Sequence, residues 1–349
     1  NIQEEPHKRR VRYKGKYPRN YKEKYKELNP EKYQDTIEKV IRKGSTPAGM
    51  HISIMVREII DFLQIKPGQT GFDATLGYGG HTKAMLECLK GQGHMYATDV
   101  DPIESAKTKK RLADAGFGED ILTIRLQNFC TIDEIAKEAG GFDFVLADLG
   151  VSSMQIDNPD RGFSFKVDGP LDLRLNPEKG ISAAERLAQI DEDELAGMLW
   201  ENSDEPYAEE LAHAIVTERK HGKPIDTTTR LREVIEETLS FLPEKEKKDT
   251  VKKTCQRTFQ ALRIDVNNEF EVLYEFMEKL PGALKPGGRA AILTFHSGED
   301  KLVKKALKQG YKEGIYSEIA NDVVRPSAEE CAQNGRARST KMRWAVRAE

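Results

Sequence analysis

The sequence contains few cysteines and no long apolar run. Its 349 residues include four cysteines, and none of them stands in a Cys-x-x-Cys pair. This pattern argues against a disulfide framework or a metal site and favours a reducing compartment, so we expect a cytoplasmic protein. No stretch of about 18 uncharged apolar residues occurs, and the N-terminus is densely charged, so we expect neither a transmembrane helix nor a signal peptide.

Positive charge is concentrated at one end of the chain. The sequence is 38% hydrophobic and 32% charged, which is typical of a globular protein with a core. The formal net charge is −3, yet residues 1–43 hold nine lysines and five arginines against seven acidic residues. We therefore treat residues 1–45 as a basic N-terminal extension, which suggests a polyanionic partner.

The basic N-terminal extension also carries regularly spaced tyrosines. They recur every four residues, at Tyr13, Tyr17, Tyr21 and Tyr25. Tyrosine can stack on nucleic-acid bases while lysine meets phosphates, so the pattern suits an RNA partner. The alternative is an arm that packs its tyrosines on its own body, and the sequence leaves both open.

Strand-like apolar segments alternate with helix-like segments after residue 70. Helices are expected at 81–90 and 102–115. An alternation of this kind predicts an α/β fold with a parallel, Rossmann-like sheet. The expected strands are residues 71–76, 94–98, 121–126, 142–147 and 290–295.

The alternation stops after the fourth expected strand. Residues 150–180 form a long loop, which is unusual in a compact domain unless it is functional. Helical patterns follow, so we expect an inserted helical domain at 171–253. Residues 46–170 and 254–349 would then form one α/β domain on either side of this insert.

Local sequence signals predict helix starts within the insert and the structure of the segment that follows it. Two capping boxes predict helix starts, Ser182 with Glu185 and Asp191 with Glu194. The charge-rich run 243–248 is expected to be a solvated turn. A single helix is expected from residue 259 to about residue 280.

A glycine loop follows the first expected strand and reads D-A-T-L-G-Y-G-G-H at residues 73–81. Glycines at such a strand-to-helix turn let a ligand approach the backbone. Asp99 ends the next strand, twenty residues after Gly79. A carboxylate there can accept hydrogen bonds from ribose hydroxyls, which indicates an adenosine-containing cofactor.

The loop favours S-adenosylmethionine (SAM) over a nicotinamide dinucleotide. It lacks the third glycine of the G-x-G-x-x-G pattern that packs beneath a pyrophosphate. Asp73 precedes the loop and Asp148 ends the fourth strand, and these acids suit the sulfonium and ammonium groups of SAM. We predict SAM, with a nicotinamide-dependent oxidoreductase as the alternative.

Further motifs follow the loop in a characteristic order. They are D-L-G-V-S-S at 148–153, R-G-F-S-F at 161–165, D-G-P-L-D at 168–172, R-T-F-Q-A-L-R-I at 257–264, P-G-G-R at 286–289, F-H-S at 295–297 and R-A-R-S at 336–339. With these motifs the chain resembles the RsmH (MraW) family of 16S rRNA cytosine-N4 methyltransferases over about residues 50–349.

The resemblance implies a Rossmann-like SAM-binding domain with an inserted helical domain. It implies methyl transfer to the N4 amine of a cytidine in small-subunit rRNA near the decoding centre, so ribosomal RNA or the small ribosomal subunit is the expected partner. It also implies SAM contacts at Gly79, Gly80, His81, Asp99, Phe129, Asp148 and Gln155.

Asp148 and His296 are the candidate catalytic residues. A cytosine N4 amine is a weak nucleophile, because its lone pair is delocalised into the ring. The enzyme must place the amine in line with the methyl group, and an acceptor on its N–H would stabilise the developing charge. Asp148 fits that role, although it could instead bind only the cofactor. His296 is either a base or a hydrogen-bonded wall residue.

The candidate substrate-binding residues are Arg161, Phe163, Arg263 and Ser297. Both arginines suit phosphates, but either could be a buried ion-pair partner. His81 is not expected to bind a metal, because no second ligand has suitable spacing.

The sequence departs from the family pattern at four places. They are the basic N-terminal extension, residues 51–54, Gly298, and residues 207–213, where the family carries arginines. These departures predict a divergent paralogue. The alternatives are methylation of another RNA and a SAM-binding, RNA-binding paralogue without this activity; a monomer and a homodimer are both compatible with the sequence.

Overall fold

The computed structural model describes residues 52–349, so the basic N-terminal extension and its tyrosines lie outside the described residues. Within the described part, the chain forms two compact units. The sheet unit comprises residues 52–154, 271–295 and 300–349, and the helical unit comprises residues 155–270 and 296–299. The sequence placed the insert at 171–253, a narrower span than the helical unit.

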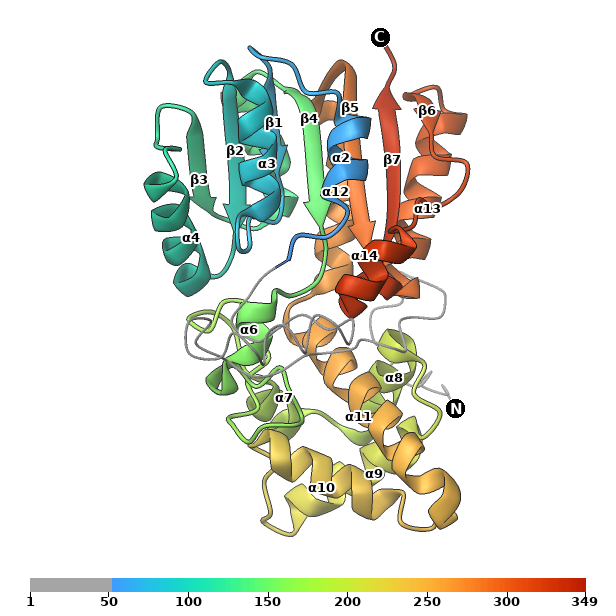
Figure 1. Ribbon diagram of the computed structural model, residues 1–349. Helices are drawn as coiled ribbons and strands as arrows, with labels where there is room; N and C mark the ends of the chain where they lie inside the picture. Colours follow the sequence, from blue (N-terminus) through green and yellow to red (C-terminus); the bar gives the residue numbers. More distant parts are fainter. Residues whose placement is uncertain (1–51) are drawn as a thin grey trace, which may run out of the picture. The chain divides into compact units, whose positions relative to one another are not determined.

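The sheet unit is built on a seven-stranded sheet with the order β3-β2-β1-β4-β5-β7-β6 (Figure 1). Strands β1 to β5 are parallel, and β7 runs antiparallel to both of its neighbours. The bounds are β1 Thr70–Asp73, β2 His94–Asp99, β3 Leu122–Leu126, β4 Phe142–Asp148, β5 Leu284–Thr294, β6 Tyr316–Ile319 and β7 Lys341–Arg347.

All five predicted strands are present, and the predicted Rossmann-like α/β fold is confirmed. From β1 the chain builds outward through β2 and β3, and then returns to place β4 on the other side of β1. Sheets of this kind bind ligands outside the carboxyl ends of the strands at such a reversal. The topology therefore predicts a ligand site at the carboxyl ends of β1 and β4.

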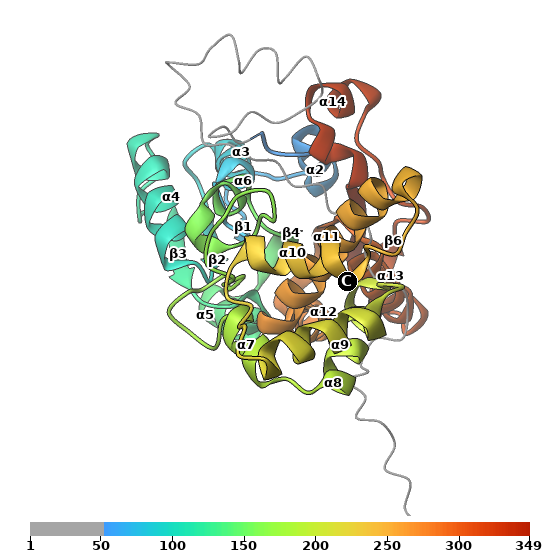
Figure 2. The ribbon, with the colours of Figure 1, turned by 90° about the horizontal axis from the view of Figure 1, so that it is seen from below.

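Helices cover both faces of this sheet. Figures 1 and 2 show α2 and α3 on one face and α5 and α12 on the other. The sheet-associated helices are α2 Val56–Leu63, α3 Gly80–Leu89, α4 Pro102–Asp114, α5 Ile132–Ala139, α12 Glu269–Ala283, α13 Ser297–Lys312 and α14 Ala328–Gln333. Two 3₁₀ turns, η1 Phe129–Thr131 and η3 Gly335–Ser339, complete the connections.

Aromatic side chains fill the centre of the sheet unit. Phe72 and Phe142 are fully buried and stack with ring centroids 5.1 Å apart. Phe144 on β4 packs so closely on β1 that a Cβ at Gly71 would overlap its ring. Glycine is therefore required at that position by packing rather than by backbone conformation.

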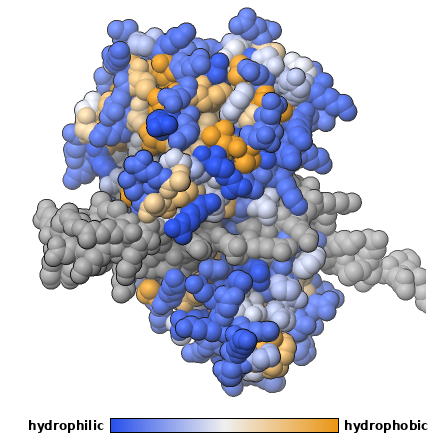
Figure 3. All heavy atoms as spheres, turned by 45° about the vertical axis from the view of Figure 1, so that its right-hand side comes forward, coloured by the Kyte–Doolittle hydropathy of each residue, from blue (hydrophilic) through white to orange (hydrophobic). Residues whose placement is uncertain are grey.

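The helical unit contains α6 Ser153–Asp157, η2 Pro159–Arg161, α7 Ala183–Gln189, α8 Glu192–Ser203, α9 Ala208–Lys220, α10 Thr228–Thr238 and α11 Glu244–Val266. Helix α8 packs against both α9 and α11. No helix among residues 52–349 is long and apolar enough to cross a membrane. On the face shown in Figure 3, exposed apolar residues are scattered among hydrophilic ones.

Both predicted capping boxes start helices. The Ser182 hydroxyl accepts a hydrogen bond from the backbone N–H of Glu185, and the Asp191 carboxylate accepts one from Glu194. Each side chain satisfies an otherwise unpaired N–H of a first helical turn. Ser182 is the N-cap of α7, and Asp191 is the N-cap of α8.

Two local predictions were wrong. The run 243–248 is the first turn of α11 rather than a loop, because acidic residues suit a helix N-terminus and Lys247 pairs with Glu244 at 3.1 Å. The helix expected across residues 259–280 is broken in two, since Asn268 adopts a positive φ of 48°. The side chain of Asn267 stabilises the break by donating to the carbonyls of Leu173 and Arg263.

A buried ion pair joins α13 to β7. Asp300 is 7% exposed and accepts hydrogen bonds from Arg343 Nε at 2.7 Å and Nη2 at 3.0 Å. Burial alone would raise the pKa of Asp300, but the hydrogen bonds and charge of Arg343 outweigh it and hold the pKa below its usual value. This pair stabilises the fold above the unfolded-state pKa of Asp300, and its contribution is lost as pH falls through the folded-state pKa.

Arg343→Met leaves the Asp300 carboxylate buried and without its main partner. We expect the free energy of unfolding to fall by about 3–5 kcal/mol, measured by urea titration at neutral pH. Arg338→Met is the matched control because Arg338 is exposed, and its effect should stay within about 0.5 kcal/mol. Equal effects of the two variants would contradict this reading.

Candidate active site

Three carboxylates end neighbouring strands of the sheet. Asp73 ends β1, Asp99 ends β2 and Asp148 ends β4, and these strands are adjacent in the order β2-β1-β4. Because the three strands are parallel, their carboxyl ends lie at the same edge of the sheet. The edge therefore carries a concentration of negative charge suited to a cationic ligand.

Asp73 holds the turn that carries the glycine loop. It is 0% exposed and accepts hydrogen bonds from the backbone N–H of Thr75 at 3.0 Å and the hydroxyl of Thr82 at 2.5 Å. Burial raises its pKa, and these hydrogen bonds oppose the rise. Its bonds all go to the strand-to-helix turn, so its role in the structure is to fix that turn.

The glycine loop needs glycine at two positions. Gly77 and Gly79 have φ angles of 52° and 90°, in the left-handed region that side chains disfavour. A Cβ at Gly79 would also lie 2.7 Å from the Thr108 methyl group. Gly79 caps α3, which begins at Gly80, so the first N–H groups of this helix belong to the loop.

Helix α4 clamps the same loop from the other side. The Thr108 hydroxyl donates to the carbonyl of Gly77 at 2.5 Å, and Arg111 Nη1 donates to the carbonyl of Tyr78 at 2.8 Å. The Arg111 guanidinium also lies 3.7 Å from the centroid of the Tyr78 ring. Sequence reasoning missed these two residues, and their i, i+3 spacing on a polar helix face was the available signal.

Asp99 is oriented by the backbone around it. Its Oδ2 accepts from the N–H of Gly77 at 3.2 Å, and its Oδ1 accepts from the N–H of Asp101 at 3.0 Å. Burial, reinforced by the charge of Asp101, raises the pKa of Asp99 to about 7. Each carboxylate oxygen has a second acceptor position, so the group can still bind two ribose hydroxyls.

Asp148 lies against His81 from α3. His81 Nδ1 is 3.4 Å from Asp148 Oδ2, and the Asp148 side chain is 23% exposed. Burial raises the pKa of Asp148 to about 6, with the charges of His81 and Arg336 lowering it and that of Asp73 raising it. At neutral pH this carboxyl is ionised and near its titration range. The sequence-predicted pair His81 and Asp148 is thus brought together by the fold.

Arg336 ties the C-terminal segment to the loop after β4. Its Nη1 donates to the hydroxyl of Ser153, and its Nη2 donates to the carbonyl of Val151 at 3.3 Å. The guanidinium therefore fixes the D-L-G-V-S-S segment and adds positive charge near Asp148. Arg336 is the first residue of the R-A-R-S motif, but the sequence alone did not predict a role for it.

Phe129 begins η1, just after β3. Its ring meets that of Phe276 edge to face, with centroids 5.2 Å apart, and the side chain is half-buried. A supported, partly exposed ring suits stacking on an adenine. Its cofactor contact stays a prediction.

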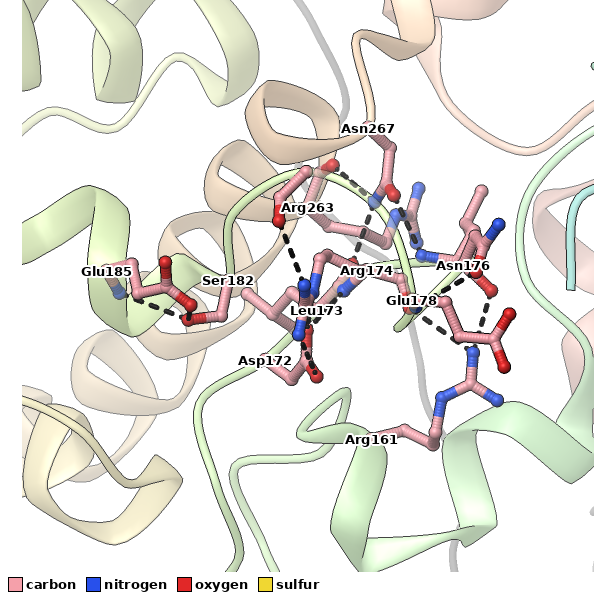
Figure 4. Close-up of polar contacts among 12 residues, drawn as sticks. Arg161, Asp172, Leu173, Arg174, Asn176, Glu178, Ser182, Glu185, Arg263 and Asn267 are labelled. Carbon is pink, nitrogen blue, oxygen red and sulfur yellow. Dashed lines mark hydrogen bonds and ion pairs between the residues drawn. The ribbon is translucent and has the colours of Figure 1, made fainter.

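The two arginines proposed to bind substrate are buried within the helical unit. Arg161 is 3% exposed and donates from Nη2 to the carbonyls of Leu175 and Arg174, at 2.8 and 3.3 Å (Figure 4). Arg263 is 2% exposed and pairs with Glu269 at 3.0 Å. These contacts favour the ion-pair and structural alternative, while phosphate binding stays a prediction.

The remaining substrate and cofactor candidates also lie in sheltered positions. Phe163 is 1% exposed and Gln155, in α6, is 7% exposed. Ser297 is half-buried at the start of α13. Direct contact of Phe163 with RNA requires a rearrangement, so its role stays a prediction, as do those of Gln155 and Ser297.

His296 is held as a neutral ring. Its Nδ1 accepts from the N–H of Glu299 at 3.2 Å, so the ring proton sits on Nε2, which lies 3.3 Å from Glu299 Oε1. Burial and the charge of Arg263 lower the pKa of His296 well below its ordinary value. With both nitrogens directed at Glu299, the ring is poorly placed to act as a base, and catalysis by it stays a prediction.

Among residues 52–349, no group of three His, Cys, Asp or Glu side chains is placed to hold a metal ion. The described site offers carboxylates, an imidazole and backbone groups. A cationic organic cofactor fits this donor set.

A model of the MraW methylase family matches residues 48–348. The chain belongs to the MraW methylase family. Its cofactor is accordingly SAM, and the three strand-end carboxylates are the acidic edge of a SAM-dependent methyltransferase.

Relatives of this MraW methylase match along nearly the whole chain. It is 82% identical to "Ribosomal RNA small subunit methyltransferase H 1" of Agathobacter rectalis, over 99% of both chains. It is 62% identical to "Ribosomal RNA small subunit methyltransferase H 2" of Alkaliphilus metalliredigens, again over 99% of both chains. A relative from Thioalkalivibrio sulfidiphilus is 37% identical over 86% of this chain and 98% of its own.

The first of these alignments spans 347 residues, so it must include the basic N-terminal extension. The extension is therefore shared with that relative and is not peculiar to this chain. The narrower prediction of a divergent paralogue stays a prediction.

SAM affinity should depend on the ionisation of Asp99. Below its pKa of about 7 the protonated carboxyl loses one acceptor and its charge, so affinity should fall about tenfold between pH 8 and pH 6. Calorimetric titration across this range measures the effect. Asp99→Asn should bind SAM weakly at every pH and lose the dependence near pH 7; a wild-type affinity that is flat across the range would contradict the assignment.

Proposed function

We propose that this MraW methylase transfers the methyl group of SAM to the exocyclic N4 amine of a cytidine in small-subunit (16S) rRNA near the decoding centre. The support is the family, the names of the relatives and an acidic strand edge that matches the charge of the cofactor. Such an activity places the protein in the cytoplasm with the ribosomal RNA or the small subunit as its partner.

The acidic edge suits SAM in charge. When bound, SAM supplies a methyl group on a positively charged sulfur. Asp99 would accept the ribose hydroxyls, and Phe129 would cover the adenine. The N–H groups that begin α3 at Gly80 would bind the carboxylate of the methionine part. Gly79 lets the cofactor approach the backbone, while Thr108 and Arg111 keep the loop in place.

Asp148 is the residue proposed to act on the amine. Its carboxylate would accept a hydrogen bond from one N4–H and so turn the nitrogen lone pair toward the methyl group. The same contact stabilises the positive charge that develops on nitrogen, and Asp148 can then take the proton. With a pKa of about 6 the group is ionised at neutral pH and remains a usable proton acceptor.

The helical unit is proposed to recognise the RNA. Cytidines are accessible only where RNA is single-stranded or the base is turned out of its stack. Helix α9 begins with Glu209 and Glu210 in its first turn, where the family pattern carries arginines. That acidic start favours a second candidate, the same chemistry on a different RNA.

The test is nucleoside mass spectrometry after incubation with SAM and unmodified small-subunit particles. New N4-methylcytidine is expected. Cofactor binding without methylation of the particles would contradict the rRNA assignment, and a parallel incubation with total RNA tests the second candidate.

Asp148→Asn removes the charge and proton-accepting capacity with little change in shape. We expect kcat to fall about 10²–10³-fold, with a smaller change in SAM affinity. Asp114→Asn, at the exposed end of α4, is the control and should retain activity. An Asp148→Asn variant that loses SAM binding in proportion to its rate would instead make Asp148 purely a cofactor ligand.

A further inference from the structure

Helix α13 has one buried apolar face and one exposed basic face. Leu302, Val303 and Leu307 are buried, and α13 approaches β6 so closely that a Cβ at Gly310 would lie 2.5 Å from the ring of Tyr316. Figure 1 shows α13 beside β6 and β7. The opposite face is exposed and carries five lysines, which we call the α13 lysine face: Lys301, Lys304, Lys305, Lys308 and Lys312.

The spacing of these lysines places them on one side of the helix. They recur at intervals of three or four residues, which is the interval between neighbours on a helix surface. With a rise of about 1.5 Å per residue, the α13 lysine face is roughly 16 Å long. Tyr311 is exposed and lies on the same side, seven residues after Lys304. Residues 301–312 contain no acidic residue, so the positive charge is uninterrupted.

The α13 lysine face lacks the acidic partners that lysines have on another helix of the chain. In α11, Lys247 pairs with Glu244 and Lys253 pairs with Asp249. Within residues 52–349, none of the five lysines of the α13 lysine face takes part in an ion pair. The face therefore keeps its full charge available for an external anion.

This charge pattern is unfavourable for the helix by itself. Lysines four residues apart repel each other and destabilise an isolated helix, and Lys304, Lys308 and Lys312 form two such pairs in succession. The buried apolar face and the Asp300–Arg343 ion pair hold α13 in place despite this repulsion. A polyanion bound along the face would relieve it.

The α13 lysine face begins near the edge of the sheet that carries the candidate site. Helix α13 follows β5, which runs parallel to β4, and Leu293 of β5 is the register partner of Asp148. The carboxyl ends of the two strands therefore lie side by side. Lys301 stands one turn into α13. An RNA strand that reaches Asp148 can thus continue along the lysine face.

The buried apolar face of α13 determines which polyanion fits. A basic amphipathic helix binds a membrane surface by inserting its apolar side into the lipid. In α13 that side is covered by the protein, so only the lysines and Tyr311 are available to a partner. Lysines that neutralise phosphates, next to an aromatic ring on which a base can stack, are typical of RNA binding without sequence readout.

We propose that the α13 lysine face binds the phosphate backbone of the substrate RNA outside the methylation site. The identity of that RNA as small-subunit rRNA rests on the proposed function, whereas RNA binding by this face does not. The face holds the RNA and does not touch the reacting atoms. It therefore contributes to RNA affinity and not to the rate of methyl transfer at saturating RNA.

The test is the salt dependence of RNA binding by the full chain, with a 16S rRNA transcript as the probe. The triple variant Lys304→Gln, Lys308→Gln and Lys312→Gln removes three charges from the face. Each phosphate contact contributes about 0.7–0.9 to the slope of log Kd against log salt concentration, so the slope should fall by about 2–3. Affinity at low salt should fall about tenfold or more.

The matched control removes the same charge from lysines that already have acidic partners. It combines Lys109→Gln, Lys247→Gln and Lys253→Gln, whose partners are Glu119, Glu244 and Asp249. The control should keep the wild-type slope, and arginine at positions 304, 308 and 312 should restore it. Equal losses in the control and the triple variant would overturn the proposal. Binding of wild-type protein to phosphatidylserine vesicles but not to RNA would do the same.

Methylation of small-subunit particles gives an independent readout. In the triple variant, KM for the particles should rise about tenfold while kcat and SAM affinity are retained. Methylation with an unchanged KM and an unchanged salt slope would overturn the role of this face. Wild-type protein that binds RNA through the face but methylates no particle would contradict the proposed function instead, so the two failures are distinguishable.

Discussion

The concentration of carboxylates at the ends of adjacent parallel strands is the constraint on which the site depends. Asp73, Asp99 and Asp148 meet at one edge of the sheet, and burial raises the pKa of each. Such an arrangement is unfavourable unless hydrogen-bond donors or positive charges compensate it. The loop, the helix that follows it and the C-terminal segment all supply that compensation, so the local structure around the edge follows from its charge.

Each acid is compensated in a different way, and the difference separates their functions. Asp73 accepts hydrogen bonds from hydroxyl and N–H groups of its own turn, so its role is to stabilise that turn. Asp99 accepts only from backbone N–H groups and keeps acceptor capacity for a ligand. Asp148 faces the side chains of His81 and Arg336, which leaves it ionised at neutral pH and within reach of a proton transfer. One edge of a sheet thus combines a structural carboxyl with the two carboxyls that are proposed to bind the cofactor and to act on the amine.

Most of the sheet could be predicted from the sequence, because strand periodicity and turn residues are local signals. The capping boxes at Ser182 and Asp191 were correct for the same reason. The break at Asn268 was missed because it depends on Asn267 reaching carbonyls almost a hundred residues away, at Leu173. The glycine loop, Asp99 and Asp148 could be predicted from their positions at strand ends, but neither these positions nor the family resemblance indicated the contacts of Thr108 and Arg111 with the loop. The burial of Arg161 and Arg263 follows from tertiary packing, which a charge pattern does not reveal.

The central claim is that the acidic edge binds a cationic adenosine cofactor. Calorimetric titration of the full chain at pH 8, with SAM and with nicotinamide adenine dinucleotide in separate cells, tests it most directly. The account predicts one equivalent of SAM bound and no heat of binding for the dinucleotide, since the loop has no site for a pyrophosphate. Binding of the dinucleotide with no binding of SAM would contradict it.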